Sequence, residues 1–353
     1  MKNVRLLLYL ILPACYSITY SQNSQLHFEH IGEAQGISQS NVLCITQDSK
    51  GFMWFGTWDG LNKYDGYKMS VYKNDPADSS SLSNNYINGI SKSKNGNLWI
   101  ATEGGGLCHF NRSQENFTRL QHRSNNANDI ISNVVNCVLE DDRGMVWIGT
   151  PQGLDRYDTS KKLFEHFTFK TTDTTSISDN FIKYIFQDSE HNLWLGTALG
   201  GLNLFDRTTK KFHRYQHNQY NSASVNSNDI YSIFEDSKKR LWIGTNGNGL
   251  DLFNRQNETF RHFKHDENNI HSLAGNTVLA INEDAENNLW ISSENQGISV
   301  FNITTSVFSV YKNDEVDKSS ISNNSVYAIY RDSKNNMGWE ILQVASTCLA
   351  AIS

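Results

Sequence analysis

One tryptophan recurs along this chain at a nearly constant interval, and this repeat limits the possible folds more than any other feature. Successive members are spaced by 45, 48, 47, 48 and 48 residues. They are Trp54, Trp99, Trp147, Trp194, Trp242 and Trp290. Five of the six copies have an acidic residue six positions earlier: Asp48, Asp141, Asp188, Asp236 and Asp284. The second copy has Ser93 there instead. Such a period indicates units that each pack against their neighbours.

Each unit contains four short runs of β-forming residues separated by polar turns, and no 3.6-residue apolar periodicity indicates a helix. In the fifth unit the runs are 230–234, 241–245, 250–253 and 260–264. Four strands every 40 to 50 residues or so are typical of a β-propeller blade. We therefore predict an all-β, seven-bladed β-propeller of four-stranded blades with an incomplete last blade. The predicted units are 36–80, 81–128, 129–175, 176–223, 224–271, 272–319 and 320–337.

The repeated residues are expected to be structural. A tryptophan beside an apolar residue on a central strand should pack between adjacent blades, although a row of exposed indoles could instead form a platform for sugars. The turn aspartates should accept hydrogen bonds from backbone N–H groups before the second strand. A Gly-Thr pair such as Gly244-Thr245 should end that strand where backbones crowd.

Residues 228–254 resemble the two-component regulator propeller repeat almost throughout, and the likeness extends over about residues 26–337. The resemblance implies the periplasmic sensor part of a hybrid two-component receptor. A complete receptor of that family would have two propellers, an immunoglobulin-like domain, one membrane helix and a histidine kinase, and would act as a homodimer. The implied ligand is an oligosaccharide derived from a polysaccharide. We interpret the chain as a truncated receptor without the kinase part.

Ligand contacts are expected where the copies differ, because the shared residues are structural. The loops between second and third strands vary, and in a propeller they cluster around one mouth of the central channel. The predicted ligand-binding residues are Trp58, Asp59, Glu103, Gln152, Asn246, Asn248, Glu294 and Gln296. Trp58 is the one aromatic residue among them and could stack on a sugar ring. Alternatively, it packs on a neighbour and the polar members are ordinary solvated turns.

Other functions receive less support from the sequence. A net charge of −6 excludes a basic nucleic-acid surface. We predict no catalytic residues, no cofactor and no metal site, since neither HExxH, P-loop nor CxxC spacing occurs. A propeller glycoside hydrolase or lyase remains an alternative, because Glu103 and Glu294 could face the same mouth. A protein-interaction scaffold using long polar loops such as 74–85 is a third.

The two ends of the chain carry separate predictions. Residues 1–21 have the charged, apolar and small-residue regions of a secretory signal, so export to the periplasm is expected. Cys15 leaves a lipoprotein signal as an alternative, and no later stretch is apolar enough to span a membrane. Residues 26–31 resemble a fourth strand that would complete the last blade. Residues 338–353 depart from the repeat, either through a frameshift in the gene, which sequencing past the stop codon would show, or as a diverged cap.

Overall fold

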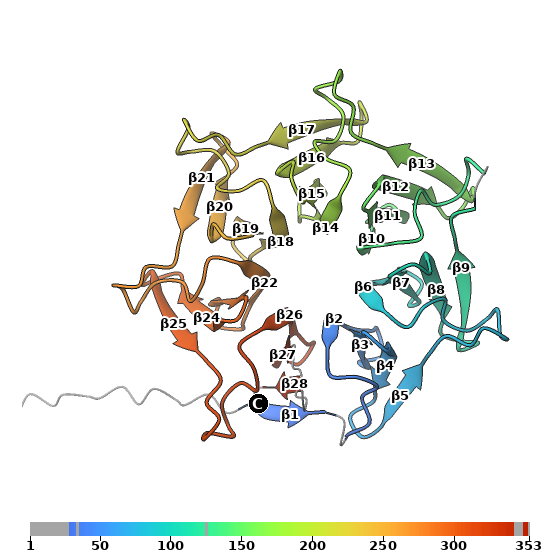
Figure 1. The fold of residues 1–353 in the computed structure, drawn as a ribbon, viewed down its shortest axis with the longest axis horizontal. Coiled ribbons are helices and arrows are strands. Elements are labelled where there is room, and N and C mark those ends of the chain that lie inside the picture. The colour runs from blue at the N-terminus through green and yellow to red at the C-terminus, as the bar shows by residue number, and fades with distance from the viewer. Residues whose placement is uncertain (1–27, 33–34, 124–125, 342–348, 352–353) are drawn as a thin grey trace, which may run out of the picture.

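Antiparallel β-sheets arranged in a ring around a central channel make up the structure (Figure 1). The computed structural model describes residues 28–32, 35–123, 126–341 and 349–351. The predicted signal at residues 1–21 lies outside these residues. In the described part of the chain, no helix is both long and apolar enough to cross a membrane.

The described residues form six complete four-stranded blades, each from one continuous segment with its strands in chain order. The first strand of each blade lies at the channel and the fourth at the rim (Figure 1). The blades near the N-terminus comprise β2 (Val42–Gln47), β3 (Met53–Thr57), β4 (Gly60–Tyr64) and β5 (Met69–Tyr72); β6 (Ile87–Lys92), β7 (Leu98–Thr102), β8 (Leu107–Asn111) and β9 (Asn116–Leu120); and β10 (Cys137–Glu140), β11 (Met145–Thr150), β12 (Gly153–Asp158) and β13 (Leu163–Phe167). The next three comprise β14 (Ile182–Gln187), β15 (Leu193–Thr197), β16 (Leu202–Asp206) and β17 (Lys211–Tyr215); β18 (Ile230–Glu235), β19 (Leu241–Thr245), β20 (Leu250–Asn254) and β21 (Thr259–Phe263); and β22 (Val278–Glu283), β23 (Leu289–Ser293), β24 (Gly297–Asn302) and β25 (Val307–Tyr311). The predicted all-β propeller with four-stranded blades is confirmed.

The remaining sector of the ring holds a partial seventh sheet. Its first two strands, β26 (Val326–Arg331) and β27 (Met337–Ile341), form a full hairpin. The sheet continues through two short strands, β28 (Leu349–Ala351) and β1 (Glu29–Ile31), in the order β26-β27-β28-β1. The leading strand therefore lies at the outer edge of the last sheet, as the sequence predicted. Segments of the irregular tail occupy the second and third positions.

Contacts across the ring closure tie this sheet to both neighbours. Phe28, which directly precedes β1, packs in one apolar cluster with Trp290 of the sixth blade and Met337 of β27. On the other side, the backbone N–H of Ser333 donates to the side-chain oxygen of Gln47 at 2.8 Å. The first and the last blades are thus in direct contact.

The recurring tryptophans lie between blades. Trp54 and Trp194 are at most 1% exposed. Their rings contact a phenylalanine on the third strand of the following blade, with centroids 5.1 Å apart for Trp54–Phe110 and 5.5 Å for Trp194–Phe253. A buried aromatic side chain of this size removes about 150–250 Å² from water. These indoles are core residues, so the alternative that they form an exposed sugar platform is wrong.

The recurring aspartate holds both the turn and the tryptophan. Oδ1 of Asp48 accepts backbone N–H groups of Lys50 and Phe52 at 2.8 and 3.1 Å, as predicted for this position. Oδ2 accepts the indole Nε1–H of Trp54 at 2.7 Å. The same bond to the indole occurs in the other four Asp-containing copies at 2.8 Å. The six-residue spacing therefore places a buried carboxylate against the one polar atom of a buried indole.

Tight contact between blades accounts for a recurring glycine. A Cβ added at Gly56, in the middle of the ladder between β2 and β3, would lie 2.5 Å from Cγ2 of Ile87 on the next blade. Gly149 and Gly196 face Ile182 and Ile230 in the same way. The crowding expected at this position is present, but it comes mainly from side chains, above all an isoleucine of the next blade, and not from backbones.

Candidate functional site at the loop end of the channel

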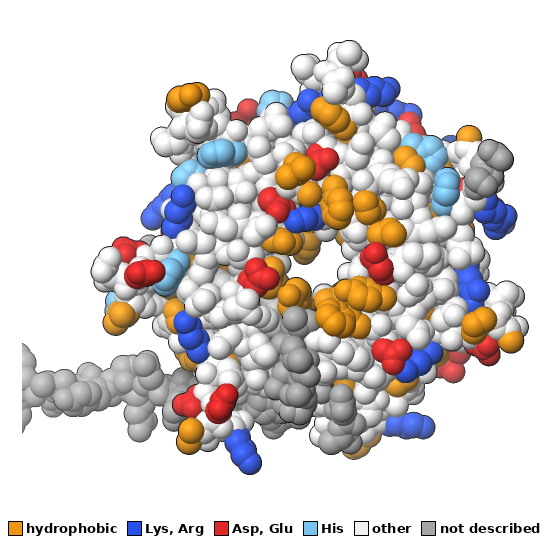
Figure 2. All heavy atoms as spheres, in the orientation of Figure 1, with side chains coloured by type: hydrophobic (Ala, Val, Ile, Leu, Met, Phe, Trp, Pro, Cys, Tyr) orange, Lys and Arg blue, Asp and Glu red, His pale blue; other side chains and the backbone are white. Residues whose placement is uncertain are grey.

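All loops between second and third strands lie at the end of the channel where the first strands begin. Pairing shows this in the first blade, where Val42 at the start of β2 lies opposite Thr57 at the end of β3. The channel is a cavity of about 430 Å³ lined by the first strands. Figure 2 shows the ring with an open centre bordered by hydrophobic and acidic side chains. We call the loop end of this cavity the channel mouth.

Trp58 is the exposed aromatic residue that the sequence singled out at this mouth. It is 41% exposed, in contrast to the buried indoles between blades. Its ring stacks on Tyr86, with centroids 5.7 Å apart and an interplanar angle of 17°. Tyr86 immediately precedes β6 and so belongs to the second blade. Packing against a neighbour therefore fixes the orientation of Trp58 while part of the indole stays in solvent.

Two other predicted residues, Glu103 and Asn246, are held by residues at the start of first strands. Oε2 of Glu103 accepts Nδ2–H of Asn88 at 2.8 Å. Asn246 donates from Nδ2 to Asp229 at 2.9 Å and accepts the hydroxyl of Thr277 at 3.2 Å. Both side chains are thereby placed at the channel mouth with polar atoms fixed by neighbours.

Glu294 joins this group through a tyrosine of the seventh sheet. Burial raises the pKa of Tyr327, and the negative charge of Glu294 adds to that effect. Burial and the negative charge of Glu103 also raise the pKa of the neighbouring Tyr86 phenol. Both phenols therefore stay protonated at neutral pH and can donate hydrogen bonds.

The other four predicted residues have partners elsewhere in their own surroundings. Asp59 forms an ion pair with Lys73 at 2.5 Å, and Gln296 accepts from Lys312 at 3.0 Å. Both lysines directly follow a fourth strand, so these two side chains lie toward the rim. Gln152 is exposed, and its backbone N–H donates to the hydroxyl of Thr150 in the same turn. The backbone carbonyl of Asn248 accepts a hydrogen bond from the side-chain Nδ2–H of Asn226. None of these contacts links the four side chains to the other predicted residues, and their part in ligand binding stays a prediction.

Sequence reasoning missed the residues that flank the start of each first strand. Lys183 forms an ion pair with Asp229 at 2.6 Å, and its ammonium lies 4.0 Å from the ring centroid of Tyr231. These positions lie on either side of the apolar residue with which the first strand of most blades begins. Unlike that apolar residue, they differ from one copy of the repeat to the next. The loops were chosen because their residues differ between copies. The same criterion, applied to the residues around the start of each first strand, would have identified these positions too.

His166 and His262 each have a buried aspartate as a structural partner. Nδ1 of His166 lies 2.6 Å from Oδ1 of Asp155, and Nδ1 of His262 lies 2.6 Å from Oδ1 of Asp251. The hydrogen bond to the buried aspartate raises the pKa of His166 to about 9. Among the described residues, no group of three histidine, cysteine, aspartate or glutamate side chains is placed to hold a metal ion.

The mouth thus combines a fixed aromatic face with hydrogen-bond donors and acceptors. Stacked Trp58 and Tyr86 offer an apolar surface, while Glu103, Asn246 and the Lys183–Asp229 pair offer polar contacts. This combination suits a flat ligand with apolar faces and a hydroxylated edge.

Comparison with protein families identifies the repeat. The family described as two-component regulator propeller matches six segments of the chain, residues 36–59, 81–104, 129–152, 176–198, 224–247 and 272–295. Histidine kinase P4 of Formosa agariphila is 48% identical over 63 residues, which is 18% of this chain and 5% of that protein.

Solved structures with the same fold include extracellular domains of two-component and one-component systems and a lyase. The extracellular domain of a putative hybrid two-component system from B. thetaiotaomicron superposes with a TM-score of 0.78 at 26% identity, over 92% of this chain and 42% of that one. The extracellular domain of a putative one-component system from the same organism gives 0.74 at 21% identity, over 92% and 40%. Virginiamycin B lyase from Staphylococcus aureus gives 0.67 at 13% identity, over 93% and 99%, and so shares the fold alone. The chain spans less than half of either extracellular domain.

Proposed function

Because six segments of this chain match the two-component regulator propeller repeat, we propose that it is the ligand-sensing part of a hybrid two-component receptor. Similarity to extracellular domains of two-component systems supports this role. The proposal includes a seven-bladed ring, secretion through residues 1–21 and a periplasmic location. It also includes a complete receptor that is anchored in the inner membrane, carries a histidine kinase and works as a homodimer.

The ligand class that we propose is an oligosaccharide, and the exposed stack of Trp58 on Tyr86 carries this proposal. Sugar rings present C–H groups on their faces, and aromatic rings held at a fixed angle bind such faces without losing side-chain freedom. Glu103 is ordered by Asn88 and accepts hydroxyl groups. The Lys183–Asp229 pair supplies both a donor and an acceptor.

We further propose that the mouth binds its ligand without chemical turnover. A glycoside hydrolase needs an acid and a second carboxylate on opposite sides of the scissile bond. Glu103 is already engaged with Asn88, and Asp229 with Lys183, so these carboxylates serve contacts within the ring. In the receptor, a ligand that binds one arrangement of paired sensors better than another would shift their populations and thereby change kinase activity.

An oligosaccharide array followed by isothermal titration calorimetry tests this function. The array should contain neutral, uronic-acid and sulfated oligosaccharides of defined length. Trp58→Ala should weaken binding of the positive sugars by about tenfold or more, since a stacked aromatic contact is lost. Tyr220→Ala is the matched control, because Tyr220 is an 89% exposed aromatic in the connection after β17, at the rim.

Each other outcome points to a different function. Shortened sugars in the reaction mixture would identify a hydrolase or lyase. Binding of a protein partner, with no response on the array, would favour the interaction scaffold. Equal sugar affinity of Trp58→Ala and the native chain would remove the channel mouth from the ligand site.

A further inference from the structure

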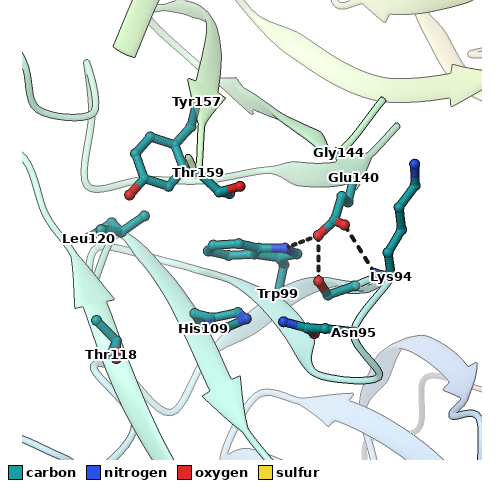
Figure 3. Close-up of a pocket in the computed structure, with 11 residues that line it drawn as sticks. Lys94, Asn95, Trp99, His109, Thr118, Leu120, Glu140, Gly144, Tyr157 and Thr159 are labelled. Carbon is teal, nitrogen blue, oxygen red and sulfur yellow. Dashed lines mark hydrogen bonds between the residues drawn. The ribbon is translucent and has the colours of Figure 1, made fainter. Parts of the chain in front are cut away.

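A second hollow lies between the second and third blades, away from the channel mouth. Its volume is about 320 Å³, and its lining includes Trp99, His109, Glu140, Tyr157 and Thr159 (Figure 3). It adjoins the turn between β6 and β7, which lies at the end of these strands opposite the loops described above. The hollow is therefore separate from the proposed oligosaccharide site.

Comparison with the other seams between blades shows what is missing here. At three other seams, an arginine that directly follows a third strand reaches back to the recurring aspartate of the preceding blade. Arg207 donates to Asp141 at 2.6 Å, and Arg255 donates to Asp188 at 2.8 Å. Arg112 forms the corresponding ion pair with Asp48. Two of these guanidinium groups also lie near the repeated indole: Arg255 is 5.8 Å from the ring of Trp194, and Arg207 is 6.0 Å from the ring of Trp147.

Both partners of this ion pair are absent at the seam between the second and third blades. Ser93 stands where the other copies have aspartate, and Thr159 stands where Arg207 and Arg255 stand in the two blades that follow. The space that a guanidinium fills at those seams is thus left open beside Trp99.

A carboxylate nevertheless reaches the indole from the third blade. Oε2 of Glu140 accepts Nε1–H of Trp99 at 2.7 Å and the hydroxyl of Ser93 at 2.5 Å, and Oε1 accepts the backbone N–H of Lys94 at 3.0 Å (Figure 3). The side-chain ammonium of Lys94 donates to the backbone carbonyl of Asp142. Among the described residues, no lysine, arginine or histidine forms an ion pair with Glu140, so the charge of its carboxylate is not neutralised by a direct partner.

Aromatic side chains complete the hollow. The imidazole of His109 lies against Trp99 with ring centroids 4.2 Å apart, and Tyr157 meets the indole edge-on at 6.3 Å. Nε2 of His109 is buried and has no hydrogen-bond partner among the described residues. A negative charge, aromatic faces and an unpaired imidazole nitrogen together form a site for a flat organic cation.

We propose that this hollow binds an alkylguanidinium group, which takes the place of the arginine present at neighbouring seams. The group would pair with Glu140 and lie beside Trp99, as Arg207 pairs with Asp141 and lies 6.0 Å from the ring of Trp147. Its source is either a small molecule such as free arginine or an arginine side chain of a protein. This inference does not depend on the proposed oligosaccharide function.

Calorimetry and tryptophan fluorescence with three probes test the proposal. The probes are free L-arginine, a short peptide with blocked ends and one arginine, and L-citrulline, which has a similar shape and no charge. The cationic probes should bind and citrulline should not. Preference for the free amino acid would indicate a small-molecule ligand, and preference for the peptide a protein partner. Equal binding of citrulline, or no binding of either cation at millimolar concentration, would overturn the proposal.

Two variants place the binding in this hollow. Glu140→Gln keeps an acceptor for the indole and removes the charge, so the affinity for arginine should fall about tenfold or more. Thr159→Arg supplies the missing guanidinium from the chain itself and should abolish binding. Unchanged affinity in folded Glu140→Gln would overturn the site even if Thr159→Arg fails to fold.

A third variant creates the same vacancy at another seam. Arg207→Ala should weaken the seam between the third and fourth blades, and added arginine should restore part of the lost thermal stability while citrulline should not. Absence of this rescue would contradict the inference that the vacated space accepts a free guanidinium group.

Discussion

The seam between the second and third blades and the seam that follows it are built differently around the same buried tryptophan. At the seam after the third blade, Asp141 binds both the turn and Trp147, and Arg207 neutralises it. At the seam before it, Glu140 binds Trp99 from the neighbouring blade, with no cation in the arginine position. The difference shows that the fold requires an acceptor for the indole N–H, whereas the ion pair is dispensable.

The largest effect should come from removing the indoles themselves. Trp147→Ala should lower the free energy of unfolding by about 3–5 kcal/mol, because a fully buried side chain leaves a cavity. Trp99→Ala should cost less, since Trp99 already borders a hollow and loses fewer contacts. Urea unfolding followed by circular dichroism measures both. Equal costs would show that the two seams are packed equally well.

The next largest difference in stability between the two seams should come from removing the carboxylate that accepts the indole N–H. Asp141→Asn should cost about 1.5–3 kcal/mol, because a carboxylate that accepts from backbone, indole and guanidinium groups is lost. Glu140→Gln should cost less, as no arginine is left unpaired. The same urea titration decides this order, and a greater loss in Glu140→Gln would show that the open seam depends more strongly on its one carboxylate.

Rebuilding the ion pair should have a smaller effect. Ser93→Asp alone should destabilise the chain, because it places a second carboxylate beside Glu140. Thr159→Arg should relieve this repulsion, with a favourable coupling of about 1 kcal/mol in a double-mutant cycle. Additive effects of the two substitutions would mean that these positions do not meet across the seam as Asp141 and Arg207 do.

The pH dependence of two histidines should give the smallest effect, below about 1 kcal/mol for each partly exposed group. Burial lowers the pKa of His109 in the open seam, so its contribution to stability should be lost as pH falls below the ordinary value of 6.5. His166 has its pKa raised to about 9 by Asp155, so its contribution is complete below pH 6.5 and is lost as pH rises through about 9.

Substitution by glutamine separates these two effects. His109→Gln should reduce the acid loss of stability, and His166→Gln should reduce the alkaline loss. Thermal melts at pH 5, 7 and 9.5 or so distinguish them. A change on the wrong side of neutrality in either variant would contradict the assigned charge states.

Periodicity in the sequence was sufficient to predict the blades, the burial of the tryptophans and the leading strand β1. These features depend on residues that are repeated in every unit, so each copy supports the interpretation of the others. The replacement for the missing acceptor of Trp99 was not predicted, because Glu140 lies 41 residues away on another blade. Only the arrangement of the ring brings the two together.

The candidate site was predicted less well than the fold. Variation among loops selected Trp58 and Glu103, which the structure places against Tyr86 and Asn88 near the starts of first strands. It also selected Asp59 and Gln296, which bind lysines near the rim. A loop position does not reveal whether its side chain turns toward the axis or away from it, since that depends on partners from other strands.

The hydrogen bond from Ser333 to Gln47 joins residues that are 286 positions apart. A contact of such long range cannot form until Ser333 has been synthesised and has left the ribosome, so the circle is open until then. We therefore expect the amide of Ser333 to be among the last to gain protection from hydrogen exchange during refolding. Until that step, the faces of the first and last sheets that meet at this junction are exposed to other chains, which makes the junction the most vulnerable point for aggregation.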